Sequence, residues 1–276
     1  MNNVTGIDSI SKKKFEFTAP SNWNEVNEKQ LIAWAAICLK KLEFGEAIRM
    51  ALIVFYSIPP IKFFLIPESQ KVELAPTLEF LFGPNKLIRW IIKEVKIASF
   101  LAMTRRYYGP EDRLSNITIG EFRRLEFYWQ AFTKSYELSA KSYEHRDSAE
   151  GFLDLLIATL YRPKRKGLID KDVREDISEH GLRLRAEQMA KLPRKVRHAI
   201  LLNYEGCRAY IREKYLDKLP KGESKSESEI FDYNGIILSV SGGKFGTFKE
   251  TESAPLYEFL QHVVDTAEEV ERLKSR

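Results

Sequence analysis

Ile177–Leu216 reads ISEHGLRLRAEQMAKLPRKVRHAILLNYEGCRAYIREKYL, and it carries a helical pattern along most of its length. Apolar residues recur three and four positions apart, which is the period of an amphipathic helix. Pro193 breaks the pattern once, and proline suits the first turn of a helix because an N–H group there has no partner inside the helix. We therefore predict two helices, over residues 177–192 and 193–216, joined at Pro193.

The same period recurs on both sides of this segment. Asn27 and Thr118 each begin a capping-box pattern, in which the first side chain and the side chain three residues later satisfy each other's free backbone N–H. Ser148 is a further candidate N-cap. The pattern predicts helices over residues 27–42, 46–57, 77–82, 85–95, 118–132, 149–161 and 254–273.

Three segments give weaker signals. Pro59, Pro60 and Pro67 argue against helix between residues 58 and 67, and Gly109-Pro110 indicates a loop over residues 101–117. Residues 231–240 fit either a helix or a strand, because periodicity does not resolve short apolar runs, and we expect a helix.

These elements predict a mainly α protein, an irregular multi-helix domain with a linked C-terminal helical element. We expect a flexible N-terminus over residues 1–20, in which a short extended piece with Phe15 and Phe17 packs on the body. The helical domain then covers 21–218. Lys, Glu and Ser dominate residues 219–229, which are predicted to be a linker, and the C-terminal element covers 230–276.

The composition is that of a folded protein of the cytoplasm. Apolar residues make up 44% of the 276 residues and charged residues 30%, which is ordinary for a globular domain. Cys38 and Cys207 are too few for a disulfide or zinc framework, and we expect two buried thiols. The N-terminus lacks a secretory pattern. Pro59-Pro60 and Lys62 interrupt the apolar stretch 50–66, so we predict no membrane partner.

No pattern in the chain indicates catalysis. The four histidines lack the spacing of a metal site, and there is no Gly-x-Ser-x-Gly elbow for a nucleophile. Ser241-Gly242-Gly243-Lys244 lacks the full phosphate-loop spacing, and the end of a helix at Gly242 explains the same residues. We therefore predict a protein that is not an enzyme and has no cofactor or metal.

Charge is distributed unevenly along the sequence. Residues 161–217 hold 15 Lys and Arg against 9 Asp and Glu, whereas residues 218–276 hold 8 against 11. A basic cluster of this kind can neutralise phosphates, but aromatic residues that would stack on bases are scarce there. Nucleic-acid contact and a solvated or protein-facing surface both stay open. The candidate residues are Arg162, Lys164, Arg165, Lys166, Arg194, Lys195 and Arg197.

The acidic C-terminal segment is the candidate protein-binding element. A Gly-rich break over residues 241–248 precedes it, and apolar residues then recur at three- and four-residue spacings. Such a helix can lay its apolar face in a groove of a partner, or it can dock on its own domain. The candidate contacts are Leu256, Phe259, Leu260, Val263, Val264 and Ala267.

Several short motifs together resemble a known group of proteins. They are Leu153–Pro163, Asp172–Glu175, Lys191–Pro193, Ala199–Arg208, Gly243–Gly246 and Pro255–Leu260. With them, residues 20–273 resemble uncharacterised proteins from phage and prophage tail gene clusters, which look like tail-assembly chaperones.

The resemblance implies a non-enzymatic assembly factor. Such a protein would bind the tape measure protein, a long helical chain that exposes apolar stripes before assembly, and it would recruit tail-tube subunits. It would act in the host cytoplasm. A nucleic-acid-binding accessory protein that uses residues 162–197 is the alternative.

Overall fold

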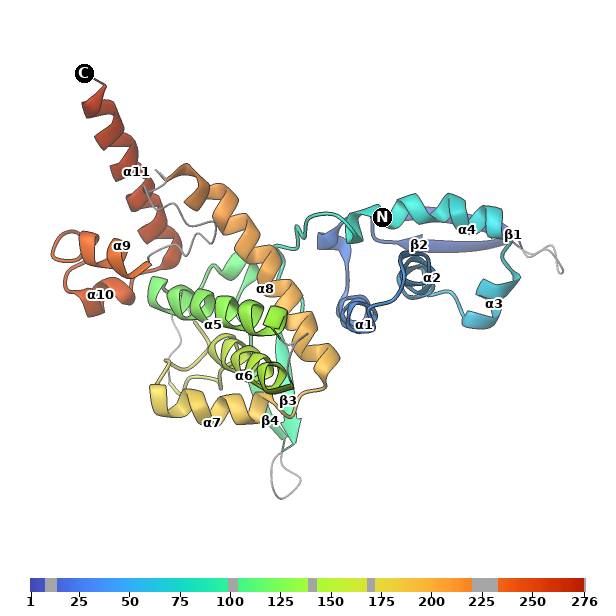
Figure 1. Cartoon of the computed structure of the whole chain (residues 1–276), viewed down its shortest axis with the longest axis horizontal. Coiled ribbons are helices and arrows are strands. Elements are labelled where there is room, and N and C mark those ends of the chain that lie inside the picture. Colours follow the sequence, from blue (N-terminus) through green and yellow to red (C-terminus); the bar gives the residue numbers. More distant parts are fainter. Residues whose placement is uncertain (8–13, 99–103, 139–142, 168–171, 220–232, 276) are drawn as a thin grey trace. The chain divides into compact units, whose positions relative to one another are not determined.

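The computed structural model confirms a mainly α protein (Figure 1). It describes residues 1–7, 14–98, 104–138, 143–167, 172–219 and 233–275. Contacts between Cα atoms divide the chain into two compact units. Unit 1 contains Met1–Ile91 and Pro193–Cys207, and unit 2 contains Ile92–Leu192 and Arg208–Arg276. The predicted linker lies outside the described residues, apart from Leu219.

Unit 1 begins with an antiparallel hairpin of β1 (Asn2–Ile7) and β2 (Lys14–Ala19), in which Val4 faces Phe17. The extended piece expected near Phe15 and Phe17 is therefore strand β2. The helices that follow are η1 (Trp23–Glu25), α1 (Glu28–Leu39), α2 (Phe44–Phe55), α3 (Pro60–Leu65), α4 (Glu68–Leu74) and η2 (Ala75–Leu81).

Local signals account for the start of α1 and for part of the unit 1 core. The Asn27 side chain accepts a hydrogen bond from the Gln30 N–H, and the Gln30 side chain accepts one from the Asn27 N–H, both at 3.0 Å. The predicted capping box is therefore confirmed. Trp34 and Phe55 are both buried, and their rings meet edge to face with their centres 6.3 Å apart. This contact joins α1 to α2.

The prediction that prolines exclude helix between residues 58 and 67 is wrong. Pro60 opens α3 in its first turn, and Pro67 is the residue just before α4. Both prolines lie at the start of a helix, where a backbone N–H would have no acceptor within the helix. They therefore set where α3 and α4 begin.

The predicted helix over residues 85–95 is also wrong. Residues 85–93 form neither helix nor strand, and β3 begins at Glu94. Side chains replace the helical hydrogen bonds, because Ile88 N–H donates to Asn24 Oδ1 and Ile91 N–H donates to Asn203 Oδ1. Leu87, Trp90 and Ile92 are buried in this extended segment.

Helix α8 (Arg194–Lys214) supplies the surface against which this extended segment packs in unit 1. A Cβ atom at Gly206 would come within 2.3 Å of the Leu87 carbonyl oxygen, so only glycine lets α8 lie this close to the backbone at Leu87. Cys207 is buried beside it, as expected, and its sulfur lies 3.7 Å from that oxygen. Cys38 is exposed, which corrects the prediction of two buried thiols, because it lies on the outer side of α1.

Unit 2 is built on α5 (Ile119–Leu138), α6 (Tyr143–Leu160) and α7 (Glu179–Met189), with α6 packed against both of the others (Figure 1). Ser148 lies inside α6 and is not its N-cap. Strands β3 (Glu94–Ala98) and β4 (Thr104–Tyr108) pair antiparallel, so part of the predicted loop 101–117 is a strand. The short helix η4 (Asp112–Leu114) follows.

The C-terminal part of unit 2 holds η5 (Leu216–Lys218), α9 (Tyr233–Val240), α10 (Phe248–Glu252) and α11 (Leu256–Lys274). The helix expected over residues 231–240 is confirmed by α9. Gly242 has φ of +88°, a left-handed conformation that suits glycine at the end of a helix. The helix α10 is an element that the sequence did not predict.

Candidate protein-binding surfaces

The candidate contacts on α11 lie mostly in the core of unit 2. Leu256, Phe259, Leu260 and Val264 are buried, and Val263 and Ala267 are half-buried. Hydrogen bonds lock the start of the helix to the start of α5, because Ile119 N–H donates to the Ala254 carbonyl and Leu256 N–H donates to the Ile117 carbonyl, both at 3.0 Å. Of the two uses left open for this face, the structure shows docking on its own domain.

The last turns of α11 differ from the first. Val270 is 44% exposed and Leu273 is 62% exposed, so the apolar stripe continues past the point where its own unit covers it. Asp265, Glu268, Glu269 and Glu271 are exposed on this half of the helix, and Arg272 and Lys274 are exposed in its last turn. The end of the helix therefore presents a small apolar edge among charges of both signs.

Arg162 is not available to a phosphate. Its side chain is 1% exposed, and its Nη1 lies 2.9 Å from Glu121 Oε1 and donates to the Glu175 carbonyl at 2.8 Å. Burial lowers the pKa of Arg162, and the Glu121 carboxylate opposes that shift. Periodicity cannot show this, because Glu121 belongs to the first turn of α5, far away in the sequence.

Arg162 belongs to a buried ion cluster with Arg174, Asp172 and Glu121. Arg174 donates through Nε and Nη2 to the two oxygens of Asp172 at 3.0 and 2.9 Å, and through Nη1 to the Leu160 carbonyl. Two guanidinium groups and two carboxylates give no net charge. Burial raises the pKa of Glu121, although Arg162 and Arg174 favour its ionised form. The cluster braces α5 against the chain that follows α6.

The remaining basic candidates do not form one patch within a unit. Lys164, Arg165 and Lys166 are exposed in unit 2, and Arg165 is paired with Asp176. Arg194, Lys195 and Arg197 belong to unit 1, since they lie in the first part of α8. The continuous basic stretch of the sequence is thus divided between the two units.

A second buried charge pair lies where α5, α8 and α9 meet. Arg208 donates through Nε and Nη2 to the two Glu126 oxygens at 2.6 and 2.9 Å, and its guanidinium lies 3.6 Å from the centre of the Trp129 ring. The Tyr233 hydroxyl is also directed at Glu126. Burial raises the pKa of Tyr233 far above its usual value. This arrangement holds α9 in place, and we assign it no chemistry.

Sequence reasoning missed an apolar face on α3 and α4. Ile61 is 80% exposed, Phe64 is 78% exposed and Val72 is 68% exposed, with Leu65 beside them. Ile61, Phe64 and Leu65 follow the i, i+3, i+4 spacing, so they share one side of α3. The prolines led to a prediction without helix between residues 58 and 67, so this spacing was not recognised as one side of a helix.

The rest of α3 and α4 explains why this face points outward. Phe63 is buried, and the Lys71 ammonium lies 4.8 Å from the centre of its ring and 2.9 Å from a Glu68 oxygen. This contact ties α3 to α4 on their inner side. The face formed by Ile61, Phe64 and Leu65, here called the α3 face, is therefore held outward by an ordered support, and Val72 is a further exposed apolar residue on α4.

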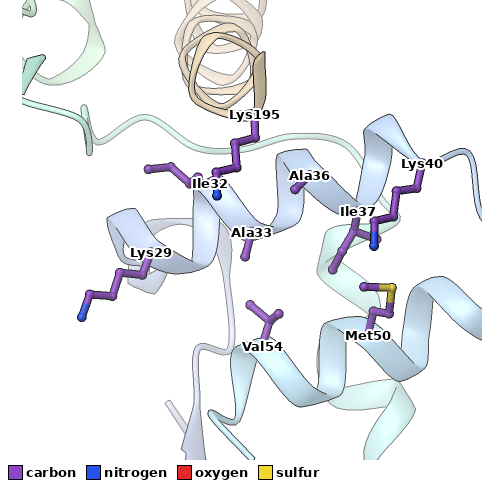
Figure 2. A pocket seen from close by; sticks show the side chains of 9 residues that line it. All are labelled: Lys29, Ile32, Ala33, Ala36, Ile37, Lys40, Met50, Val54 and Lys195. Carbon is purple, nitrogen blue, oxygen red and sulfur yellow. The ribbon is translucent and has the colours of Figure 1, made fainter. Parts of the chain in front are cut away.

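Unit 1 also contains a groove of about 420 Å³ beside α1 (Figure 2). Figure 2 shows Met50 and Val54 rising from α2 toward Ile37 and Ala33 of α1, while Lys195 reaches from α8 toward Ile32. The lining residues are Lys29, Ile32, Ala33, Ala36, Ile37, Lys40, Met50, Val54 and Lys195. The groove has an apolar floor, and its only charged groups are lysines.

The described part of the chain holds no group of three His, Cys, Asp or Glu side chains placed to bind a metal ion. Within the same residues, no helix is both long enough and apolar enough to cross a membrane. In comparisons with known proteins, no family model, curated protein or solved structure matches the chain.

Proposed function

We propose that the protein is a non-enzymatic assembly factor of the tail-assembly chaperone class, and that it binds an apolar stripe of a long helical protein through the α3 face. The observation that carries the proposal is the exposure of Ile61, Phe64 and Val72 on helices whose inner side is well packed. Exposed apolar patches on a folded protein commonly mark interaction sites.

The chemistry of the α3 face suits a helical partner. An aromatic side chain with aliphatic neighbours at helical spacing can pack against the apolar face of an amphipathic helix. Burying one such side chain fully contributes about 1.5–3 kcal/mol. An unassembled tape measure protein, with apolar stripes along its length, is the partner that the sequence resemblance suggests. Recruitment of tail-tube subunits and action in the host cytoplasm belong to the same proposal.

The nucleic-acid alternative has less support than the sequence suggested. Its first residue, Arg162, is buried in ion pairs, and Arg165 is engaged by Asp176. The other basic candidates are divided between the two units. We therefore retain this alternative only as an outcome of the test.

The test is an affinity capture of the tagged full-length chain from producing cells, with nuclease treatment and mass spectrometry. The variant is I61D/F64D. The matched control is L184D/L238D, which places the same charges at two exposed apolar positions of unit 2. We expect the wild type and the control to retain a long helical tail protein and I61D/F64D to lose it. Retention by I61D/F64D, or recovery of nucleic acid alone, would contradict the proposal.

A further inference from the structure

The groove beside α1 has an apolar floor on which small side chains leave room for another molecule. Ile32, Ala33, Ala36, Met50 and Val54 are only half-buried, so part of their apolar surface faces the groove. Alanine at positions 33 and 36 lets another backbone approach α1 closely. The volume of about 420 Å³ falls within the roughly 300–1,000 Å³ of sites that hold ligands. The groove therefore has space for several apolar side chains.

The shape of the groove favours a helix as its occupant. One row of residues along α1 follows the i, i+4, i+7, i+11 spacing of a single helix side, and it contains Lys29, Ala33, Ala36 and Lys40. Met50 and Val54, four residues apart, rise from α2 on the facing side (Figure 2). The side chains of a third helix pack between two such rows, and the small residues in the middle of the α1 row allow the closest approach.

The lysines favour an occupant with carboxylates at both of its ends. Lys29 and Lys40 end the α1 row, roughly 16 Å apart along the helix, and Lys195 reaches toward the groove from α8. Among the described residues no Asp or Glu lines the groove, although Glu28 and Glu46 belong to the same two helices. Unit 1 as a whole holds 14 Lys and Arg against 10 Asp and Glu, so its net charge has the same sign as the groove.

Two other kinds of anion match the groove less well. A nucleic-acid backbone has no aliphatic side chains to cover the floor. An amphiphile with one head group has a single carboxylate, which does not meet Lys29 and Lys40 at once. An amphipathic helix meets both requirements, because acidic residues about eleven positions apart, with apolar residues between them, match the length of the α1 row.

We propose that the groove beside α1 binds an acidic amphipathic helix of a partner protein. The apolar side chains of that helix cover the floor at Ala33 and Ala36, and its carboxylates lie near the three lysines. Complementary charge of this kind selects the partner and fixes its orientation. No residue of the α3 face lines the groove, so this is a second binding site beyond the proposed function.

The experiment measures how the full-length chain binds two synthetic helical peptides of about 18 residues, a length at which an isolated helix forms in water. Both peptides carry Leu at three- and four-residue spacings. The Glu peptide has Glu at its flanking positions, and the Lys peptide has Lys at the same positions. Fluorescence anisotropy of the dye-labelled peptides gives each Kd at low and at high salt.

The variants separate the charge of the groove from the charge of the whole chain. K29E/K40E/K195E reverses the groove, and the matched control K218E/K244E/K249E reverses three lysines of unit 2. All six positions are exposed, so both variants should keep the circular-dichroism spectrum of the wild type. A33L/A36L fills the floor with larger side chains and keeps α1 helical, since Ala and Leu both favour helix.

We expect the wild type and the control to bind the Glu peptide at least about tenfold more tightly than the Lys peptide, with a smaller difference at high salt because ions screen the contact. The preference should reverse in K29E/K40E/K195E. A33L/A36L should bind the Glu peptide more weakly than the wild type, because its floor is filled. I61D/F64D should bind the Glu peptide like the wild type.

Four results would overturn the inference. They are equal affinities of the wild type for the two peptides, an unchanged preference in K29E/K40E/K195E, a preference lost in the control, and unchanged binding in A33L/A36L. Loss of the Glu peptide in I61D/F64D would place it on the α3 face and would also overturn the inference. The α3 face is tested by capture of a tail protein, so the two proposals can fail separately.

Discussion

Helices α3 and α11 carry apolar faces of similar spacing in opposite environments. On α3, Ile61 and Phe64 point to solvent while Phe63 holds the helix to unit 1. On α11, Phe259 and Leu260 are buried in unit 2, and only Val270 and Leu273 emerge at the far end. The difference teaches that helical spacing shows where an apolar face lies but not what covers it. A short helix offers an exposed face when one of its residues anchors it from behind.

The largest expected effect comes from placing a charge on each face. F259D should destabilise unit 2 by at least about 4 kcal/mol, because removing a buried phenyl ring alone costs about 3–5 kcal/mol and an unpaired carboxylate adds to that. F64D should change stability by no more than about 0.5 kcal/mol, as is usual at an exposed position. Urea unfolding, monitored by hydrogen exchange in each unit, measures the free energy of unfolding of the two variants. Equal losses for the two variants would break the comparison.

A smaller but still large effect is expected from the ion cluster near the start of α5, where α11 docks. R174A should cost about 3–5 kcal/mol, because it leaves buried carboxylates without their partner. R165A removes an exposed pair and should cost about 0–1 kcal/mol. Hydrogen exchange should show faster opening of α5 and α11 in R174A and no change in unit 1. Unchanged exchange in α11 would show that its docking does not depend on the cluster.

Acid should affect unit 1 through the N-terminal hairpin. The Ser21 N–H, which donates to Glu25 Oε2 at 2.8 Å, and the N-terminal ammonium lower the pKa of Glu25 from its usual 4.5 to about 2. A lowered folded-state pKa contributes stability that is complete above pH 4.5 and is lost as the pH falls toward 2. The protection factors of the β1 amides, which compare the exchange rate with the intrinsic rate at each pH, should therefore fall between pH 4.5 and 2. In E25Q the fall in that range should disappear.

The smallest effect is expected at the far end of α11. V270D/L273D should leave the free energy of unfolding within about 0.5 kcal/mol of the wild type, because both residues are exposed. The free energy lost in F259D and the free energy lost in V270D/L273D together show which half of α11 is packed on unit 2. Urea unfolding at a fixed low concentration gives the value, and a loss of several kcal/mol would show that the far end is packed as well.

The fold class was predictable because much of it depends on local signals. The helices near residues 177–192 and 193–216, the capping box at Asn27 and the helix that begins after Thr118 all follow from residues within a few positions of one another. Gly242 marks the end of α9 for the same reason. These features need no knowledge of distant partners.

The rest depended on partners that are far apart in the sequence. Residues 85–93 are extended because Asn24 and Asn203 take their N–H groups. Arg162 is buried because Glu121 meets it inside unit 2. The covering of the α11 face and the exposure of the α3 face are likewise set by packing, which helical spacing alone does not show.

Footprinting with a radical or carbene reagent, read by mass spectrometry on the free chain and on the captured complex, tests the central claim most directly. The account predicts strong labelling of Ile61, Phe64 and Val72 in the free chain and their protection in the complex, with Phe259 protected in both. Labelling of Phe64 that stays the same in the complex would contradict the account, and new protection confined to α11 would move the binding site there.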